Sequence, residues 1–83
     1  MVTAYILVEM SAGHSRVLVE KLEANDNVRE VARVTGPYDV VVIISGEDLT
    51  SVSDTVMSAI HPMQGVLRTT TCVGIETRPT ETS

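Results

Sequence analysis

The run from Val40 to Ile44, Val-Val-Val-Ile-Ile, constrains the fold more than any other part of the chain. Side chains along a strand point alternately to the two faces of a sheet. A strand that is apolar at every position is therefore buried on both faces, which places it in the centre of its sheet. A chain of 83 residues that contains such a strand must cover its sheet on both sides.

The spacing of the apolar residues predicts four strands and two helices in all. We expect strands at residues 3–10, 28–35, 38–45 and 66–75, and helices at residues 14–24 and from Asp48, a candidate N-cap, to Pro62. The order strand, helix, strand, strand, helix, strand is that of two split units in tandem. We therefore predict an α+β, ferredoxin-like βαββαβ fold with a four-stranded antiparallel sheet. Its first and third strands, which are apolar on both faces, are expected at the centre.

Two helices cover one face of such a sheet and leave the other face exposed. The exposed side chains would be Tyr5, Leu7, Val41 and Ile43, or their alternates. Exposed apolar patches usually mark interfaces between proteins. A domain of this size also buries only about 60 to 65% of the surface of its unfolded chain, so association would add stability. We predict a homodimer in which two sheets pack face to face, an assembly of the dimeric α/β-barrel type.

Charge and cysteine content narrow the classes of partner and compartment. The net charge of −5 and the six scattered basic residues argue against direct binding of nucleic acid. Arg29 and Arg33, the one close pair, are interpreted as solvated positions of an edge strand. A single cysteine, the absence of a signal-peptide pattern and short apolar runs indicate a soluble, cytoplasmic protein without a membrane segment. Residues 1–75 are expected to form the domain, and residues 76–83 a disordered tail.

The turn before the central strand concentrates polar groups that suit ligand recognition. Thr35, Tyr38 and Asp39 place a hydroxyl, a phenol and a carboxylate within five residues, while Gly36 and Pro37 favour a tight turn. Asp39 has an alternative role of equal weight, which is to accept hydrogen bonds from nearby backbone amides.

The chain contains no pattern that indicates catalysis or metal binding. Its two histidines, His14 and His61, and its cysteine, Cys72, have no base, nucleophile or ligand partner at a recognisable spacing. His61 is better placed to interact with the end of the second helix. We therefore predict no catalytic residues, no metal and no cofactor.

Three segments together resemble the effector-binding domain of the Lrp/AsnC regulators. They are Val2-Thr3-Ala4-Tyr5-Ile6-Leu7-Val8, Val34-Thr35-Gly36-Pro37-Tyr38-Asp39-Val40 and Arg68-Thr69-Thr70-Thr71-Cys72, in the order and spacing of that family. The resemblance implies a dimer that can assemble into a tetramer of dimers, an octamer, with an amino-acid site near the contacts between dimers. It implies that a turn binds the ligand on one side, formed by Thr35, Gly36, Pro37, Tyr38 and Asp39. It also implies an opposite wall of the site, formed by Thr69, Thr70 and Thr71.

The chain leaves no room for the helix-turn-helix that the longer regulators carry, because its first strand begins near residue 3. The resemblance therefore implies a stand-alone, non-enzymatic module that binds an amino acid and oligomerises, with a full-length regulator as a further partner. Two alternatives stay open. One is a small enzyme of the dimeric α+β barrel kind, such as a monooxygenase or isomerase. The other is a pure assembly partner of a longer homologue.

Overall fold

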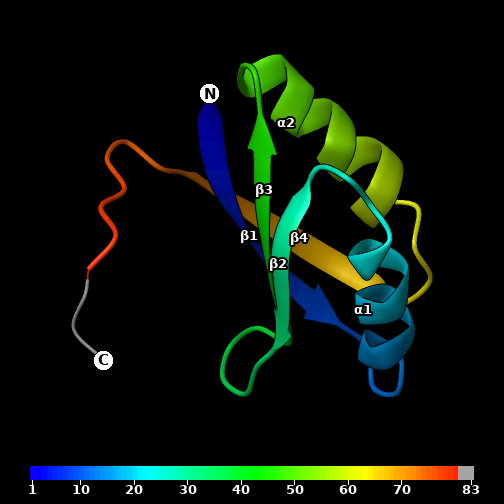
Figure 1. The fold of residues 1–83 in the computed structure, drawn as a ribbon. Helices are drawn as coiled ribbons and strands as arrows, with labels where there is room; N and C mark the ends of the chain where they lie inside the picture. The colour runs from blue at the N-terminus through cyan, green and yellow to red at the C-terminus, as the bar shows by residue number, and fades with distance from the viewer. Residues whose placement is uncertain (81–83) are drawn as a thin grey trace.

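The computed structural model describes residues 1–80 and has the predicted fold (Figure 1). Its elements are β1 (Val2–Met10), α1 (Ser15–Glu23), β2 (Val28–Arg33), β3 (Val40–Gly46), α2 (Leu49–Thr55), which continues as the π-helical turn η1 (Val56–Ile60), and β4 (Val66–Val73). All strand pairs are antiparallel, and the order across the sheet is β2-β3-β1-β4. The ferredoxin-like βαββαβ prediction is therefore confirmed, with β1 and β3 at the centre.

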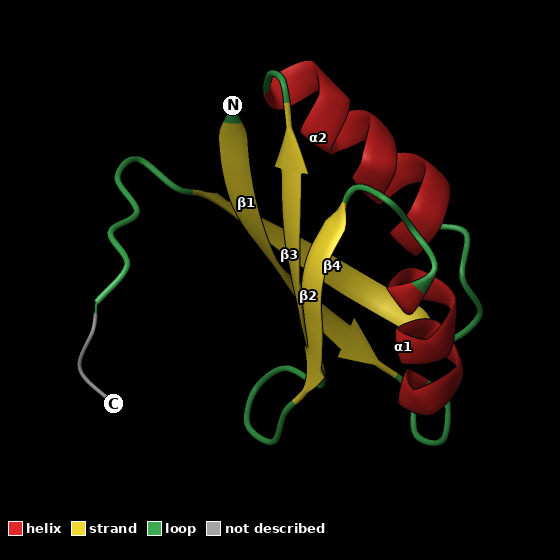
Figure 2. Cartoon of the chain, viewed as in Figure 1, coloured by secondary structure: helices red, strands yellow, loops and turns green. Residues whose placement is uncertain are grey.

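Both helices lie on the same side of the sheet, as Figure 2 shows. Alternate residues of the two central strands face them and are fully buried, with 0% exposure at Ala4, Ile6, Val8, Val40, Val42 and Ile44. These side chains pack against Leu18 and Leu22 of α1 and against Val52, Val56 and Ile60 of the second helical segment. The core is thus one layer of aliphatic side chains between sheet and helices.

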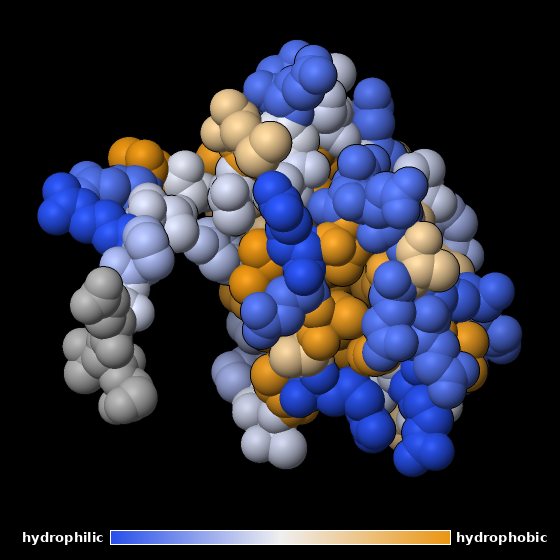
Figure 3. Space-filling model, viewed as in Figure 1, coloured by the Kyte–Doolittle hydropathy of each residue, from blue (hydrophilic) through white to orange (hydrophobic). Residues whose placement is uncertain are grey.

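The remaining side chains of β1 and β3 form an apolar band on the uncovered face of the sheet. Tyr5 pairs with Ile43 and Leu7 pairs with Val41, so the four side chains are neighbours on that face. All four are only partly buried. Figure 3 shows hydrophobic side chains near the centre of the view, on both sides of a run of hydrophilic ones.

The second helix begins where the sequence predicts. The Asp48 carboxylate accepts a hydrogen bond from the Ser51 amide at 2.8 Å, which makes Asp48 the N-cap. Hydrogen bonds from the Ser51 amide and hydroxyl hold the pKa of this exposed carboxyl below its ordinary value of 3.8. At its other end the helix widens, because the His61 amide donates to the Val56 carbonyl, five residues back.

The last strand contains an irregularity that changes which residues share a face. Met10 pairs with Val66 while Glu9 pairs with Arg68, so Leu67 is the extra residue of a bulge. Val66 therefore packs against the core, and Leu67, which a regular strand would place on the same face as Thr69, is 63% exposed.

The predicted tail, residues 76–83, lies only partly within the described residues. Residues 74–80 contain no helix or strand, and residues 81–83 of the predicted tail lie outside the described residues. Within residues 1–80, none of the helices has the length and hydropathy that crossing a membrane requires.

Candidate functional site

The turn between β2 and β3 is fixed at its base and exposed at its tip. The Val34 amide donates to the Asp39 carbonyl, and the Asp39 amide donates to the Val8 carbonyl of β1, each at 2.9 Å. Thr35, Gly36 and Pro37 are exposed. Gly36 has φ +142°, a conformation that side chains disfavour, so the tip of the turn requires glycine.

Asp39 has a structural role that ties the turn to the neighbouring strand. Its Oδ2 accepts a hydrogen bond of 2.8 Å from the amide of Met10, the residue of β1 that lies opposite the β4 bulge. The carboxylate thus satisfies the amide of a largely buried residue. The sequence left open a role for Asp39 as an acceptor for nearby backbone amides. The structure shows instead that Asp39 accepts from an amide 29 positions away, on the neighbouring strand.

The three threonines of β4 do not form one wall. Thr69 and Thr71 pair with Val8 and Ile6, so they lie on the helix side of the sheet, whereas Thr70 pairs with Leu7 and lies on the uncovered side. Thr69 is also engaged, because its hydroxyl hydrogen-bonds to the His61 ring at 2.8 Å.

Within one chain, the turn and the threonines are separated by a strand. Val8 of β1 pairs with Val40 on one side and with Thr69 on the other. Two strand spacings, about 10 Å, therefore separate Thr69 from the start of β3. The structure brings Asp39 to β1, but it does not join the turn and the β4 threonines in a single-chain pocket.

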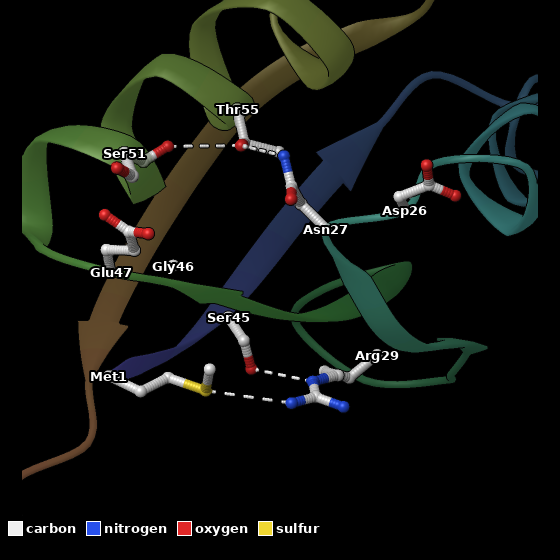
Figure 4. A pocket seen from close by; sticks show the side chains of 9 residues that line it. All are labelled: Met1, Asp26, Asn27, Arg29, Ser45, Gly46, Glu47, Ser51 and Thr55. Atoms are coloured by element: carbon white, nitrogen blue, oxygen red, sulfur yellow. Dashed lines mark hydrogen bonds between the residues drawn. The ribbon is translucent and has the colours of Figure 1, made fainter.

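A cavity of about 330 Å³ lies at the opposite end of the sheet (Figure 4). None of the eight predicted site residues lines it; its walls are Met1, Asp26, Asn27, Arg29, Ser45, Gly46, Glu47, Ser51 and Thr55. The sequence did not predict this cavity. It indicated Arg29 as a solvated position of an edge strand, and Arg29 is indeed exposed on the edge strand β2. The one local signal was the polar cluster around Asn27 and Arg29, which by itself resembles an ordinary turn. Within residues 1–80, His, Cys, Asp and Glu side chains do not gather in threes as metal ligands would.

Comparison with known proteins places the chain in a family. A model of the Lrp/AsnC ligand binding domain matches residues 3–83. A Thermus thermophilus protein of known structure, TTHA0845, is 32% identical, and the match covers 96% of this chain and 100% of that protein with a TM-score of 0.87. Among curated proteins, none matches the chain significantly.

Two longer regulators share the fold at low identity. Escherichia coli AsnC is 20% identical with a TM-score of 0.88, and the match covers 99% of this chain and 56% of that protein. The Neisseria meningitidis transcriptional regulator NMB0573, solved as a complex with L-Met, is 16% identical with a TM-score of 0.78, and the match covers 90% of this chain and 50% of that protein. This chain thus spans about half of each regulator. The family match over nearly the whole length shows that the chain belongs to the Lrp/AsnC ligand-binding domain family.

Proposed function

We propose that this chain is a non-enzymatic effector-sensing module that binds an amino acid at the Thr35–Asp39 turn and assembles through the uncovered face of its sheet. Membership of the Lrp/AsnC ligand-binding domain family supports a regulatory role for the chain. The L-Met complex of the Neisseria meningitidis regulator, which has the same fold, supports the ligand class.

The observation that carries the proposal is the construction of the turn. Its base is held by three hydrogen bonds, from the Val34, Asp39 and Met10 amides, while its tip projects into solvent. A recognition loop on a rigid support loses little conformational freedom when it binds. The Thr35 hydroxyl and the exposed main-chain groups suit a ligand carboxylate, and Asp39 has acceptor capacity beyond its bond to Met10 that suits an ammonium.

A second chain is needed to complete the site. Within one chain the turn does not face the β4 threonines, because β1 lies between them. The apolar band of Tyr5, Leu7, Val41 and Ile43 gives the chain a surface through which copies can associate. Assembly would then bring the turn of one copy towards polar residues of another, and the effector would bind between subunits.

The test is a calorimetric titration with each standard amino acid against the wild type and three variants. Thr35→Val and Tyr38→Phe each remove one hydroxyl and keep the size of the side chain. Thr50→Val makes the same change at an exposed position of α2, far from the turn, and is the matched control. Asp39→Ala is unsuitable, because it would also leave the Met10 amide without its acceptor.

We expect at least one amino acid to bind, and we expect Thr35→Val to weaken that binding by about tenfold while Thr50→Val leaves it unchanged, since a hydrogen bond to a charged group is worth about 1.5 kcal/mol or more. A full panel without binding, or equal affinities for the two threonine variants, would contradict the proposed site. No observation on residues 1–80 favours the small-enzyme alternative over this function.

A further inference from the structure

We call the cavity at the far end of the sheet the Arg29 cavity. Its arginine lies at a bulge in the edge strand β2. Val28 pairs with Ile44 and Glu30 pairs with Ile43, so Arg29 is the extra residue of a bulge in β2. Bulges re-aim side chains and are common next to binding sites. Figure 4 shows the Arg29 side chain reaching across to Ser45 and Met1.

The Arg29 guanidinium is held in place but keeps donors for a ligand. Its Nε donates to the Ser45 hydroxyl at 3.0 Å, and a terminal nitrogen lies 3.7 Å from the sulfur of Met1. A guanidinium has five N–H donors in a planar fork, so these contacts leave donors unused. A thioether is a weak acceptor, which a carboxylate oxygen would readily replace.

The charge of Arg29 is not neutralised by the described part of its own chain. The ion pairs among residues 1–80 join Arg68 to Glu9 and Arg78 to Glu76, and neither involves Arg29. The planar guanidinium matches a carboxylate in geometry as well as in charge. The arginine is therefore a positioned cation without a carboxylate partner in this part of the chain.

Two carboxylates also line the cavity and determine which class of ligand suits it. Glu47 lies on the opposite side of the view from Arg29 in Figure 4, with Ser45 and Gly46 between them, and Asp26 adds a second negative charge. One positive and two negative side chains would repel a simple carboxylate anion. They would attract a molecule that carries both a carboxylate and an ammonium.

The remaining wall is a connected set of polar groups. The Asn27 amide donates to the Thr55 hydroxyl at 3.3 Å, and that hydroxyl donates to the Ser51 carbonyl at 3.1 Å. Thr55 is only 6% exposed, so this chain of hydrogen bonds is anchored inside the fold. Such a wall is preformed and needs no rearrangement to meet a ligand.

We propose that the Arg29 cavity is a binding site for a small zwitterion, a free amino acid whose carboxylate pairs with Arg29 and whose ammonium pairs with Glu47. Its volume of about 330 Å³ lies at the small end of ligand pockets. The length of β3, about 20 Å, separates it from the Thr35–Asp39 turn, so the two sites are independent. This proposal does not rest on ligand binding at the turn.

The experiment is an NMR titration of the ¹⁵N-labelled full chain, prepared with its native Met1 because that residue lines the cavity. The probes are glycine and the other standard amino acids, with acetate and ethylamine as controls that carry only one of the two charges. The backbone amides of Arg29, Ser45 and Glu47 report on the cavity, and the amide of Gly36 reports separately on the turn.

Arg29→Gln and Glu47→Gln each remove one charge from the cavity and keep much of the length of the side chain. Arg33→Gln is the matched control, because Arg33 is an exposed residue of the same strand that does not line the cavity. We expect an amino acid to shift the cavity amides in a saturable way, acetate and ethylamine to shift them much less, and Arg29→Gln to weaken binding about tenfold or more, an effect that Arg33→Gln lacks.

Three outcomes would overturn the proposal. They are the absence of saturable shifts at the cavity amides with every amino acid, equal shifts with acetate, and equal affinities for Arg29→Gln and Arg33→Gln when both variants show wild-type circular dichroism. Shifts at Gly36 alone would overturn this site and support the turn.

Discussion

Replacing Gly65 by alanine is the perturbation whose cost follows most directly from the geometry. Gly65 has φ +90°, a left-handed conformation that costs other residues about 1–2 kcal/mol. An added Cβ would also overlap the His14 Cβ and lie 2.5 Å from its Cγ. The backbone cannot easily move away, because the Gly65 carbonyl accepts a hydrogen bond of 2.8 Å from the Ser11 amide.

Gly13 provides the matched control. Its φ of +86° is almost the same, but an added Cβ would meet nothing within 4 Å. Gly13→Ala should therefore cost only the conformational part, about 1–2 kcal/mol. Gly65→Ala should cost that amount plus about 1–3 kcal/mol for overpacking, about 2–5 kcal/mol in all.

The assay is urea unfolding followed by circular dichroism, with all variants at one protein concentration because assembly would make stability depend on concentration. The double variant Gly65→Ala/His14→Gly removes the clashing atoms and should recover the stability of Gly13→Ala to within a few tenths of a kcal/mol, since glycine is tolerated at an N-cap. This rescue keeps the test informative even if Gly65→Ala alone is largely unfolded. Equal midpoints for Gly65→Ala and Gly13→Ala, or no recovery in the double variant, would refute the reasoning.

Three further predictions concern the turn, the second helix and the uncovered face. Asp39→Ala should lower the free energy of unfolding in urea by about 1–3 kcal/mol because the Met10 amide loses its acceptor, whereas Asp39→Asn, which keeps an acceptor oxygen, should cost less. The pKa of Asp48 is lower in the folded state, so its ionised carboxylate contributes to the stability of the fold above pH 3.8, and this contribution is lost as the pH falls through the lowered pKa. Asp48→Asn should keep the cap and make stability depend less on pH at acid pH. An unchanged acid limb in a curve of stability against pH would contradict this. The proposed assembly through the uncovered face predicts that Leu7→Glu gives monomers in sedimentation equilibrium, while Val17→Glu, a similar change at an exposed helix position, leaves the association unchanged.

The fold could be predicted because its strongest local signals agree with its tertiary structure. The double-sided apolar character of Val40–Ile44 identified the central strand, and Asp48 marked the start of the second helix. Both signals depend on side-chain chemistry within a few residues, which a sequence displays directly.

The bulges could not be predicted in the same way. Each inserts one residue that shifts the alternation of faces, so Arg29 and Leu67 point where a regular strand would not place them. Both bulges are defined by the register of pairing with a distant strand. Nothing in the local sequence records that register.

The candidate site shows the same division. The turn residues could be selected from their side chains, but the bond from the Met10 amide to Asp39 joins positions 29 apart. The Arg29 cavity likewise combines residues from the start of β2, the end of β3 and α2. Sites assembled from distant segments become visible only when the fold is known.

The backbone hydrogen bond from the Gly74 amide to the Thr3 carbonyl, 2.7 Å long, brings the beginning of β1 next to the end of β4. The path of the chain from β1 to β4 therefore ends close to where it begins. A circular permutant that joins these ends and opens between Gly36 and Pro37 would run β3, α2, β4, β1, α1, β2 and keep every pair of neighbouring strands. In this permutant the tip of the turn is cut into two free chain ends. It therefore tests whether the turn must be continuous, without changing the strand pairs that hold the fold together.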